Sequence, residues 1–281
     1  MTRVLSALVL LPVVIGTIWF LPPVGTLVLA LATAALAFLE FRTMARGLGA
    51  HVSAGIGGCA VLLTCITTAA AGLTDHFFSF TGEPSQSMGD NAVYLVFMAT
   101  LIAAGGLAVG TMRPGRDVLA SVSATLFAPV YIGLPLGALV GVRGSPGLGR
   151  EAIVLLLAVI VVSDSAQYYT GRAFGRRTLA PAVSPKKTVE GAVGGVLFGT
   201  LAMAAGGRYV FESPIWILAL AGAVISLLGI VGDLFESLLK RSAGIKDSSN
   251  LIPGHGGVLD RIDSWLFVAP VYYIFVRFIA A

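Results

Sequence analysis

Apolar residues run along most of this chain in long stretches that short polar gaps separate. About 20 predominantly apolar residues cross the hydrocarbon core of a bilayer as a helix. The stretches near this length cover residues 4–21, 25–44, 54–73, 91–110, 118–142, 152–173, 191–206, 215–235 and 264–281. The pattern predicts an all-α polytopic membrane protein with about nine transmembrane helices.

Three of these stretches carry further signals. The first follows Arg3 and resembles a signal peptide, but its apolar core is long and another stretch follows at once, so we expect it to be retained as a span. The fifth contains Pro129 and Pro135 and is expected to be kinked or broken into two half-helices. The seventh has a run of glycines that predicts close packing against another helix: Gly191, Gly194, Gly195 and Gly199.

Composition agrees with a membrane protein, because 57% of the residues are apolar and only 11% are charged. The two cysteines, Cys59 and Cys65, lie in one apolar stretch on different sides of a helix, so neither a disulfide nor a metal site is expected. The net charge of +4 does not indicate nucleic-acid binding, because the basic residues lie in short loops between spans.

The distribution of lysine and arginine predicts a cytoplasmic N-terminus. With nine crossings and that orientation, all but four of the 18 basic residues face the cytoplasm. The exceptions are Arg143, Arg150, Arg208 and Arg277. The same topology places the long segments 171–190 and 237–263 inside, so the chemistry is expected on the cytoplasmic face.

Asp233, Ser237 and Lys240 are spaced to share one face of the helix that ends the eighth stretch. A carboxylate within a span is costly and usually faces a partner or a wet cavity. The alternative is that Asp233 and Lys240 only end a helix at the membrane interface.

A glycine-rich loop follows, in which Gly256 and Gly257 permit close approach of a phosphate to the backbone. Asp260 comes next, and Mg²⁺ commonly takes one or two carboxylates together with phosphate oxygens. Asp233 and Asp260 are therefore the expected metal ligands. Asp263 is placed to cap a helix beginning at Ser264, which is as good a reading of this residue as ligand binding.

The fixed positions of this region closely resemble the signature of the phosphatidate cytidylyltransferases, also called CDP-diacylglycerol synthases. They are Ser237, Lys240, Arg241, Lys246, Asp247, His255, Gly256, Gly257, Asp260, Arg261 and Asp263. Two earlier segments also resemble the family: the one around Asp164, where Gln167 replaces an expected alanine, and the one with Lys186 and Lys187. The resemblance covers about the last 120 residues, so residues 1–150 add helices without matched motifs and residues 151–281 form the catalytic part of a single membrane domain.

The resemblance implies a defined reaction. A phosphate of phosphatidic acid attacks the α-phosphorus of CTP, giving CDP-diacylglycerol and pyrophosphate for phospholipid biosynthesis. Mg²⁺, with or without a second cation, and a homodimer in the inner membrane of a bacterium are also implied. Because the attacking phosphate is already ionised, His255 is expected to position or bind phosphate and not to act as a base.

Lys186 and Lys187 precede Thr188, an expected helix cap, and both are expected to contact phosphate, with membrane anchoring as the alternative. For Asp164, the alternative to a catalytic role is an isolated aspartate hydrogen-bonded within the bundle. For the whole chain, an ion-coupled transporter remains an alternative because Asp164 and Asp233 lie within spans. A related transferase that acts on another lipid phosphate is the nearest alternative among enzymes.

Overall fold

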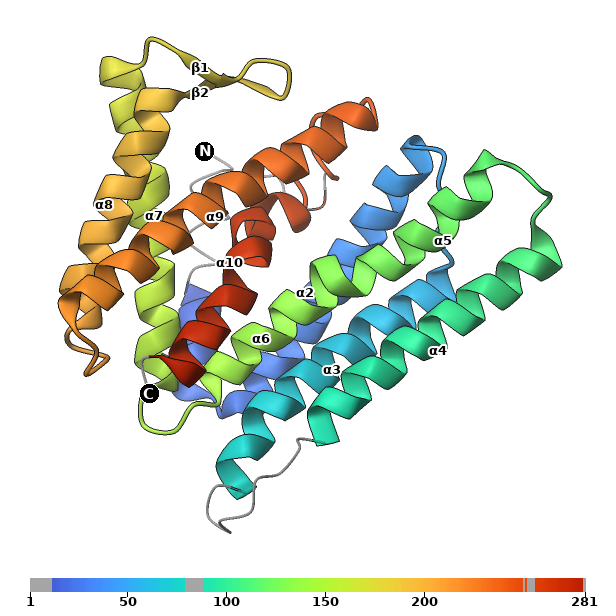
Figure 1. The fold of residues 1–281 in the computed structure, drawn as a ribbon, viewed down its shortest axis with the longest axis horizontal. Helices are drawn as coiled ribbons and strands as arrows, with labels where there is room; N and C mark the ends of the chain where they lie inside the picture. Colours follow the sequence, from blue (N-terminus) through green and yellow to red (C-terminus); the bar gives the residue numbers. More distant parts are fainter. Residues whose placement is uncertain (1–11, 79–87, 250, 252–255, 280–281) are drawn as a thin grey trace. The chain divides into compact units, whose positions relative to one another are not determined.

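A computed structural model describes residues 12–78, 88–249, 251 and 256–279, which are mostly helical (Figure 1). Residues 12–20 are helical. The elements that follow are α2 (Pro23–Gly47), α3 (Ala54–Phe78), α4 (Met88–Thr111), α5 (Arg116–Ala128), the π-helical turn η1 (Pro129–Gly133), α6 (Leu134–Arg143), α7 (Gly149–Phe174), β1 (Thr178–Ala180), β2 (Ser184–Thr188), α8 (Val189–Gly207), α9 (Ile215–Ser242) and α10 (Leu259–Phe278).

The prediction of an all-α membrane protein is confirmed. Among the described residues, seven helical segments are long and apolar enough to cross a membrane. They are Pro23–Gly47, Ala54–Ala71, Asn91–Thr111, Asp117–Arg143, Gly149–Phe174, Val189–Gly207 and Ile215–Ser242. They match seven of the nine predicted stretches. The first predicted stretch lies partly outside the described residues, and α10 is not among the seven, so the count of nine stays a prediction.

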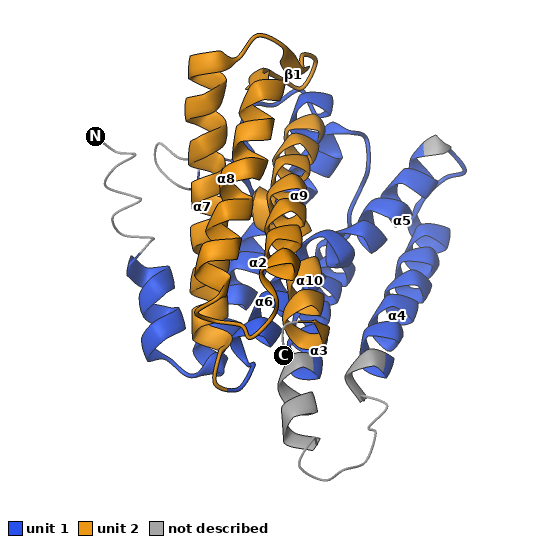
Figure 2. Cartoon of the chain, turned by 60° about the vertical axis from the view of Figure 1, so that its left-hand side comes forward, with its two compact units in different colours: residues 1–146, 239–262 blue, residues 147–238, 263–281 orange. Residues whose placement is uncertain are grey.

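The chain divides into two compact units (Figure 2). Unit 1 comprises Met1–Pro146 and Leu239–Ile262, and unit 2 comprises Gly147–Leu238 and Asp263–Ala281. The division falls within α9 and within α10, so each of these helices contributes residues to both units.

Unit 1 is built on the packing of α2, α3 and the irregular helix α5–η1–α6. A Cβ atom added to Gly133 would lie 2.5 Å from the carbonyl oxygen of Val61, and one added to Gly137 would lie 2.6 Å from that of Cys65. These two glycines therefore let the helix approach the α3 backbone. The predicted irregularity of this span is confirmed as a π-helical turn that starts at Pro129, and helical residues continue on both sides of it.

Unit 2 contains a tightly packed helical pair, α7 and α8, joined by the β1–β2 hairpin. A Cβ atom added to Gly191 would lie 2.7 Å from the carbonyl oxygen of Gln167, and one added to Gly195 would lie 3.1 Å from that of Ser163. The close packing predicted from the glycine run is therefore confirmed. Helix α10 is fixed to α7 by Tyr272, whose buried hydroxyl donates to the carbonyl of Ala152 at 2.7 Å.

Candidate active site

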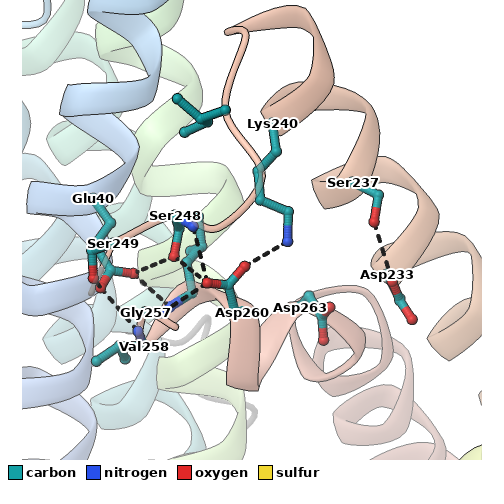
Figure 3. Close-up of polar contacts among 12 residues, drawn as sticks. Glu40, Asp233, Ser237, Lys240, Ser248, Ser249, Gly257, Val258, Asp260 and Asp263 are labelled. Atoms are coloured by element: carbon teal, nitrogen blue, oxygen red, sulfur yellow. Dashed lines mark hydrogen bonds and ion pairs between the residues drawn. The ribbon is translucent and has the colours of Figure 1, made fainter. Parts of the chain in front are cut away.

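In unit 1, the residues of the signature loop gather around a glutamate from α2. Glu40 is 5% exposed within an otherwise apolar helix. Its carboxylate accepts hydrogen bonds from the backbone N–H groups of Val258 (2.9 Å) and Leu259 (2.7 Å). It also accepts them from the hydroxyls of Ser248 (3.0 Å) and Ser249 (2.5 Å), as Figure 3 shows. These donors replace water around a buried charge that would otherwise be very costly.

Asp260 forms the second half of this network. Its Oδ1 pairs with the ammonium of Lys240 at 2.5 Å, and its Oδ2 accepts from Ser248 N–H (2.9 Å), Ser248 Oγ (2.9 Å) and Gly257 N–H (2.8 Å) (Figure 3). Burial alone would raise the pKa of Asp260. The hydrogen bond from Lys240 and those from the two N–H groups outweigh it, so the pKa lies below its ordinary value of 3.8.

The hydroxyl of Ser248 lies between these two carboxylates. It is 3.0 Å from Glu40 Oε2 and 2.9 Å from Asp260 Oδ2. A hydroxyl carries one proton, so Glu40 and Asp260 share a single donor here. The two carboxylates therefore belong to one hydrogen-bonded network, in which a change at either affects the other.

Gly256 and Gly257 are required by this network. Gly256 has a φ of 80°, in the left-handed region that favours glycine. A Cβ atom added to Gly257 would lie 2.5 Å from both carboxylate oxygens of Glu40 and would collide with the Ser248 hydroxyl. The close approach that these glycines permit is thus to carboxylates of the chain itself, and their contact with a bound phosphate stays a prediction.

Unit 2 holds a separate group of charged residues. The ammonium of Lys187 pairs with Asp233 Oδ2, and the hydroxyl of Ser237 is 3.4 Å from Asp233 Oδ1. Asp164, near the end of α7, is exposed on the chain's own surface, and its charge interacts with those of Asp233 and Lys187. The structure thus brings together four residues that the sequence singled out in three separate segments, around positions 164, 187 and 233–237.

The hairpin positions Lys187 through its connection to α8. Thr188 is the N-cap of α8 and accepts from the N–H of Gly191 at 3.1 Å, which confirms the predicted cap. The Glu190 carboxylate accepts from the N–H groups of Arg176 (2.9 Å) and Arg177 (3.2 Å), which fixes the start of the hairpin. Lys186 is exposed, and because side chains alternate along a strand it points away from Lys187.

The start of α10 differs from the prediction. The helix begins at Leu259, so Asp263 lies inside it and cannot cap a helix starting at Ser264, although it accepts from the Ser264 N–H at 2.7 Å. The helix starts earlier because the carboxylate of Glu40 satisfies the N–H groups of Val258 and Leu259. A side chain more than 200 residues away performs the capping, which no local pattern indicates.

The remaining predicted site residues lie at the surface. Arg241, Lys246, Asp247 and Arg261 are exposed, and Arg241 donates to the carbonyl of Ile245 at 3.0 Å. His255 lies outside the described residues. The sequence reasoning missed Glu40, although the signal it used for Asp164 and Asp233, an acid within an apolar stretch, applies equally to this residue.

The carboxylates differ in how well they could accept a metal ion. Among the described residues, no group of three or more histidine, cysteine, aspartate or glutamate side chains is arranged to hold one. Asp233 and Asp164 are at least one-third exposed, and they offer the oxygen ligands that Mg²⁺ prefers. Both oxygens of Asp260 already accept hydrogen bonds, so its ligation of a metal would require Lys240 or Ser248 to move.

Known sequences resemble this chain over much of its length. The profile of the cytidylyltransferase family matches residues 1–279. The chain belongs to this family. A phosphatidate cytidylyltransferase of Synechocystis is 36% identical over 230 residues, which cover 77% of this chain and 75% of the relative.

Other cytidylyltransferase-family relatives match a shorter region. A phosphatidate cytidylyltransferase of Bacillus subtilis is 42% identical over 148 residues, covering 52% of this chain and 55% of its own length. The uncharacterised protein YnbB of Escherichia coli is 44% identical over 130 residues, covering 46% of this chain and 44% of its own. In these two matches the chain spans about half the length of the relative.

Proposed function

We propose that this member of the cytidylyltransferase family is a CTP:phosphatidate cytidylyltransferase, which makes CDP-diacylglycerol and pyrophosphate. The family match over residues 1–279 carries the proposal. The Synechocystis relative is named a phosphatidate cytidylyltransferase, and it is 36% identical over a region that covers 75% of its length. The seven apolar helical segments agree with a lipid substrate that stays in the bilayer.

The proposed reaction makes one bond and breaks one. A non-bridging oxygen of the phosphatidate phosphate bonds to the α-phosphorus of CTP, and the bond from that phosphorus to the oxygen bridging to the β-phosphate breaks. Pyrophosphate leaves with the electron pair. The attacking phosphate is ionised near neutral pH, so no side chain has to remove a proton, and the protein's task is to position two anions and neutralise their charge.

Lysines and arginines of the chain are the proposed source of that neutralisation. Lys187 and Lys240 each pair with a carboxylate, which limits the orientations of the ammonium group. Exposed Arg241, Lys246 and Arg261 are free to reach phosphate oxygens from the signature segment.

A divalent cation, with or without a second one, is proposed as cofactor, with Asp233 and Asp260 as ligands. Bound Mg²⁺ would neutralise charge on the triphosphate. The exposed carboxylates of unit 2 support this proposal. Asp260 is the harder ligand to explain, because its carboxylate already accepts hydrogen bonds from neighbouring groups.

We further propose nine crossings with the N-terminus in the cytoplasm, an inner-membrane location in a bacterium, and a homodimer. If successive apolar helices cross in alternate directions, the ends of α7 and α9 and the start of α8 face one side. That side then receives Lys186, Lys187, Lys240 and Arg241, which suits the positive-inside rule and a nucleotide from the cytoplasm.

The proposal is tested with purified protein in detergent–lipid micelles containing phosphatidic acid, α-labelled CTP and Mg²⁺, with and without EDTA. We expect labelled CDP-diacylglycerol, identified by mass, with one pyrophosphate per product and no product in EDTA. Asp233→Asn and Asp260→Asn are expected to lose nearly all turnover. Product formed only from another lipid phosphate would replace the assignment by the related transferase. Uptake of a substrate into proteoliposomes, without any labelled lipid product, would favour the transporter.

A further inference from the structure

Unit 1 contains a cavity of about 620 Å³ on a part of α2 that the proposed reaction does not use. Its walls come from the end of α2, the start of α3, the end of α4 and the start of α5, four helices that run alongside one another in Figure 1. This volume lies within the range of about 300–1,000 Å³ that is usual for small-molecule sites.

Basic groups dominate one side of this cavity. Arg42, Arg46 and Arg113 line it together with His51, against a single acid, Asp117. A guanidinium is always charged at physiological pH and presents paired donors that match phosphate oxygens. Arg46 and Arg113 are exposed, and no described residue accepts a hydrogen bond or forms an ion pair with either.

The α4 residues of the lining are mostly apolar. Ala104, Leu107 and Ala108 contribute from α4, and they lie within a segment that is apolar enough to span a membrane. Arg46 is in the last turn of α2 and Arg113 directly follows the end of α4, so the basic groups lie at the ends of candidate spans. A basic rim above an apolar wall suits a ligand with a phosphate at one end and acyl chains at the other.

The wall of the cavity is held in place by the chain. Arg42 Nε donates to the carbonyl of Val52 at 3.1 Å, which fixes the link between α2 and α3. The N–H of His51 donates to the Ser121 hydroxyl at 2.9 Å, which ties the same link to α5. Arg42 is two residues after Glu40, about 200° around the helix, so the cavity and the Glu40 network lie on opposite faces of α2.

We propose that this cavity binds the phosphate-bearing headgroup of an anionic membrane phospholipid, separately from the proposed reaction. Positive residues at the ends of spans also serve as topological anchors, but anchoring requires no cavity and no wall fixed by hydrogen bonds. Three arginines that line one open pocket, together with apolar residues of α4, favour a bound lipid.

Binding of a lipid that is not the proposed substrate tests the site without any nucleotide. Delipidated protein in a non-ionic detergent is titrated with short-chain phosphatidylglycerol, and bound lipid is counted by native mass spectrometry. The variant R46Q/R113Q is compared with R150Q/R208Q, which removes two exposed arginines outside the cavity. Arg42 is left intact because it supports the wall.

We expect R46Q/R113Q to bind the lipid about tenfold more weakly or worse, because charge-assisted hydrogen bonds are lost, and R150Q/R208Q to bind like the wild type. Equal losses in both variants, or no loss in either, would overturn the site. Inorganic phosphate is added as a competitor in a second titration. Displacement of the lipid by millimolar phosphate would reassign the cavity to free phosphate, whereas no displacement supports the lipid. An unchanged thermal unfolding midpoint confirms that each variant is folded.

Discussion

At the scale of single residues, Glu40 accepts four hydrogen bonds that a substitution would disturb. Glu40→Gln keeps the shape of the side chain but replaces one acceptor oxygen by an NH₂ group that faces N–H and O–H donors. Each buried donor left without an acceptor costs about 1–3 kcal/mol, so we expect a clear loss of stability. Thermal unfolding in detergent measures it, with exposed Glu212→Gln as the matched control. Equal midpoints for the two variants would show that the carboxylate charge is not needed.

The network around Asp260 predicts a dependence of stability on pH. Because its pKa is lower in the folded chain than the ordinary value of 3.8, its contribution is complete above that value and is lost as the pH falls through the folded-state pKa. As the pH falls below about 4, we expect the wild type to lose stability more steeply than Asp260→Asn. Parallel curves of unfolding free energy against pH would contradict this.

The two neighbouring lysines of β2 are expected to behave differently. Lys187→Gln leaves Asp233 without its ammonium partner, whereas Lys186→Gln removes an exposed charge that points the other way. Because the Lys187–Asp233 pair is partly exposed, the difference in stability should be modest, about 1 kcal/mol or less. Turnover of CTP measured beside unfolding separates this effect from any shared role of the two lysines in binding phosphate. Equal stability of the two variants would show that the ion pair contributes nothing.

At the scale of elements, the contact between α7 and α8 can be tested with a single methyl group. Gly191→Ala would place a Cβ atom 2.7 Å from the backbone carbonyl of Gln167, which cannot move aside as a flexible side chain could. Gly105→Ala, in α4, meets no atom within 4 Å and should be neutral or stabilising by about 0.5–1 kcal/mol. We expect overpacking at Gly191 to cost about 1–3 kcal/mol, read from unfolding midpoints. A stabilised Gly191→Ala would contradict the close packing.

The elements also show what a sequence pattern can predict. Apolar runs, the Thr188 cap and the glycines of α8 are local signals, and each was predicted. The start of α10 was predicted five residues too late, because the N–H groups at its start bond to Glu40 and not to a neighbouring side chain. A contact between residues more than 200 positions apart cannot be predicted from the spacing of residues around position 259.

The same limit applies to the candidate site. The sequence identified Asp233, Lys187 and Asp260 by their types and their surroundings, but it could not assign partners. The structure pairs Asp233 with Lys187 and Asp260 with Lys240, and it adds Ser248 between two carboxylates. Pairing of this kind depends on tertiary packing, which periodicity does not describe.

At the scale of the whole molecule, the proposed orientation has a direct test. In a Cys59→Ala/Cys65→Ala background, Glu212→Cys lies in the link between α8 and α9, and Ala182→Cys lies in the hairpin between α7 and α8. If α8 crosses the membrane, these positions face opposite sides. We expect a membrane-impermeant maleimide to label residue 212 in intact cells and residue 182 only after permeabilisation. The reverse pattern would invert the topology.

The hydrogen bonds of Glu40 can form only late in the synthesis of the chain. Its hydrogen-bond partners lie 208 to 219 residues later in the chain. At about 5–20 residues per second, α2 would wait roughly 10–40 s before the segment that satisfies this carboxylate is made. A nascent chain that stops before Ser248 therefore lacks all four hydrogen-bond donors to the Glu40 carboxylate in α2, which distinguishes incomplete copies from finished ones.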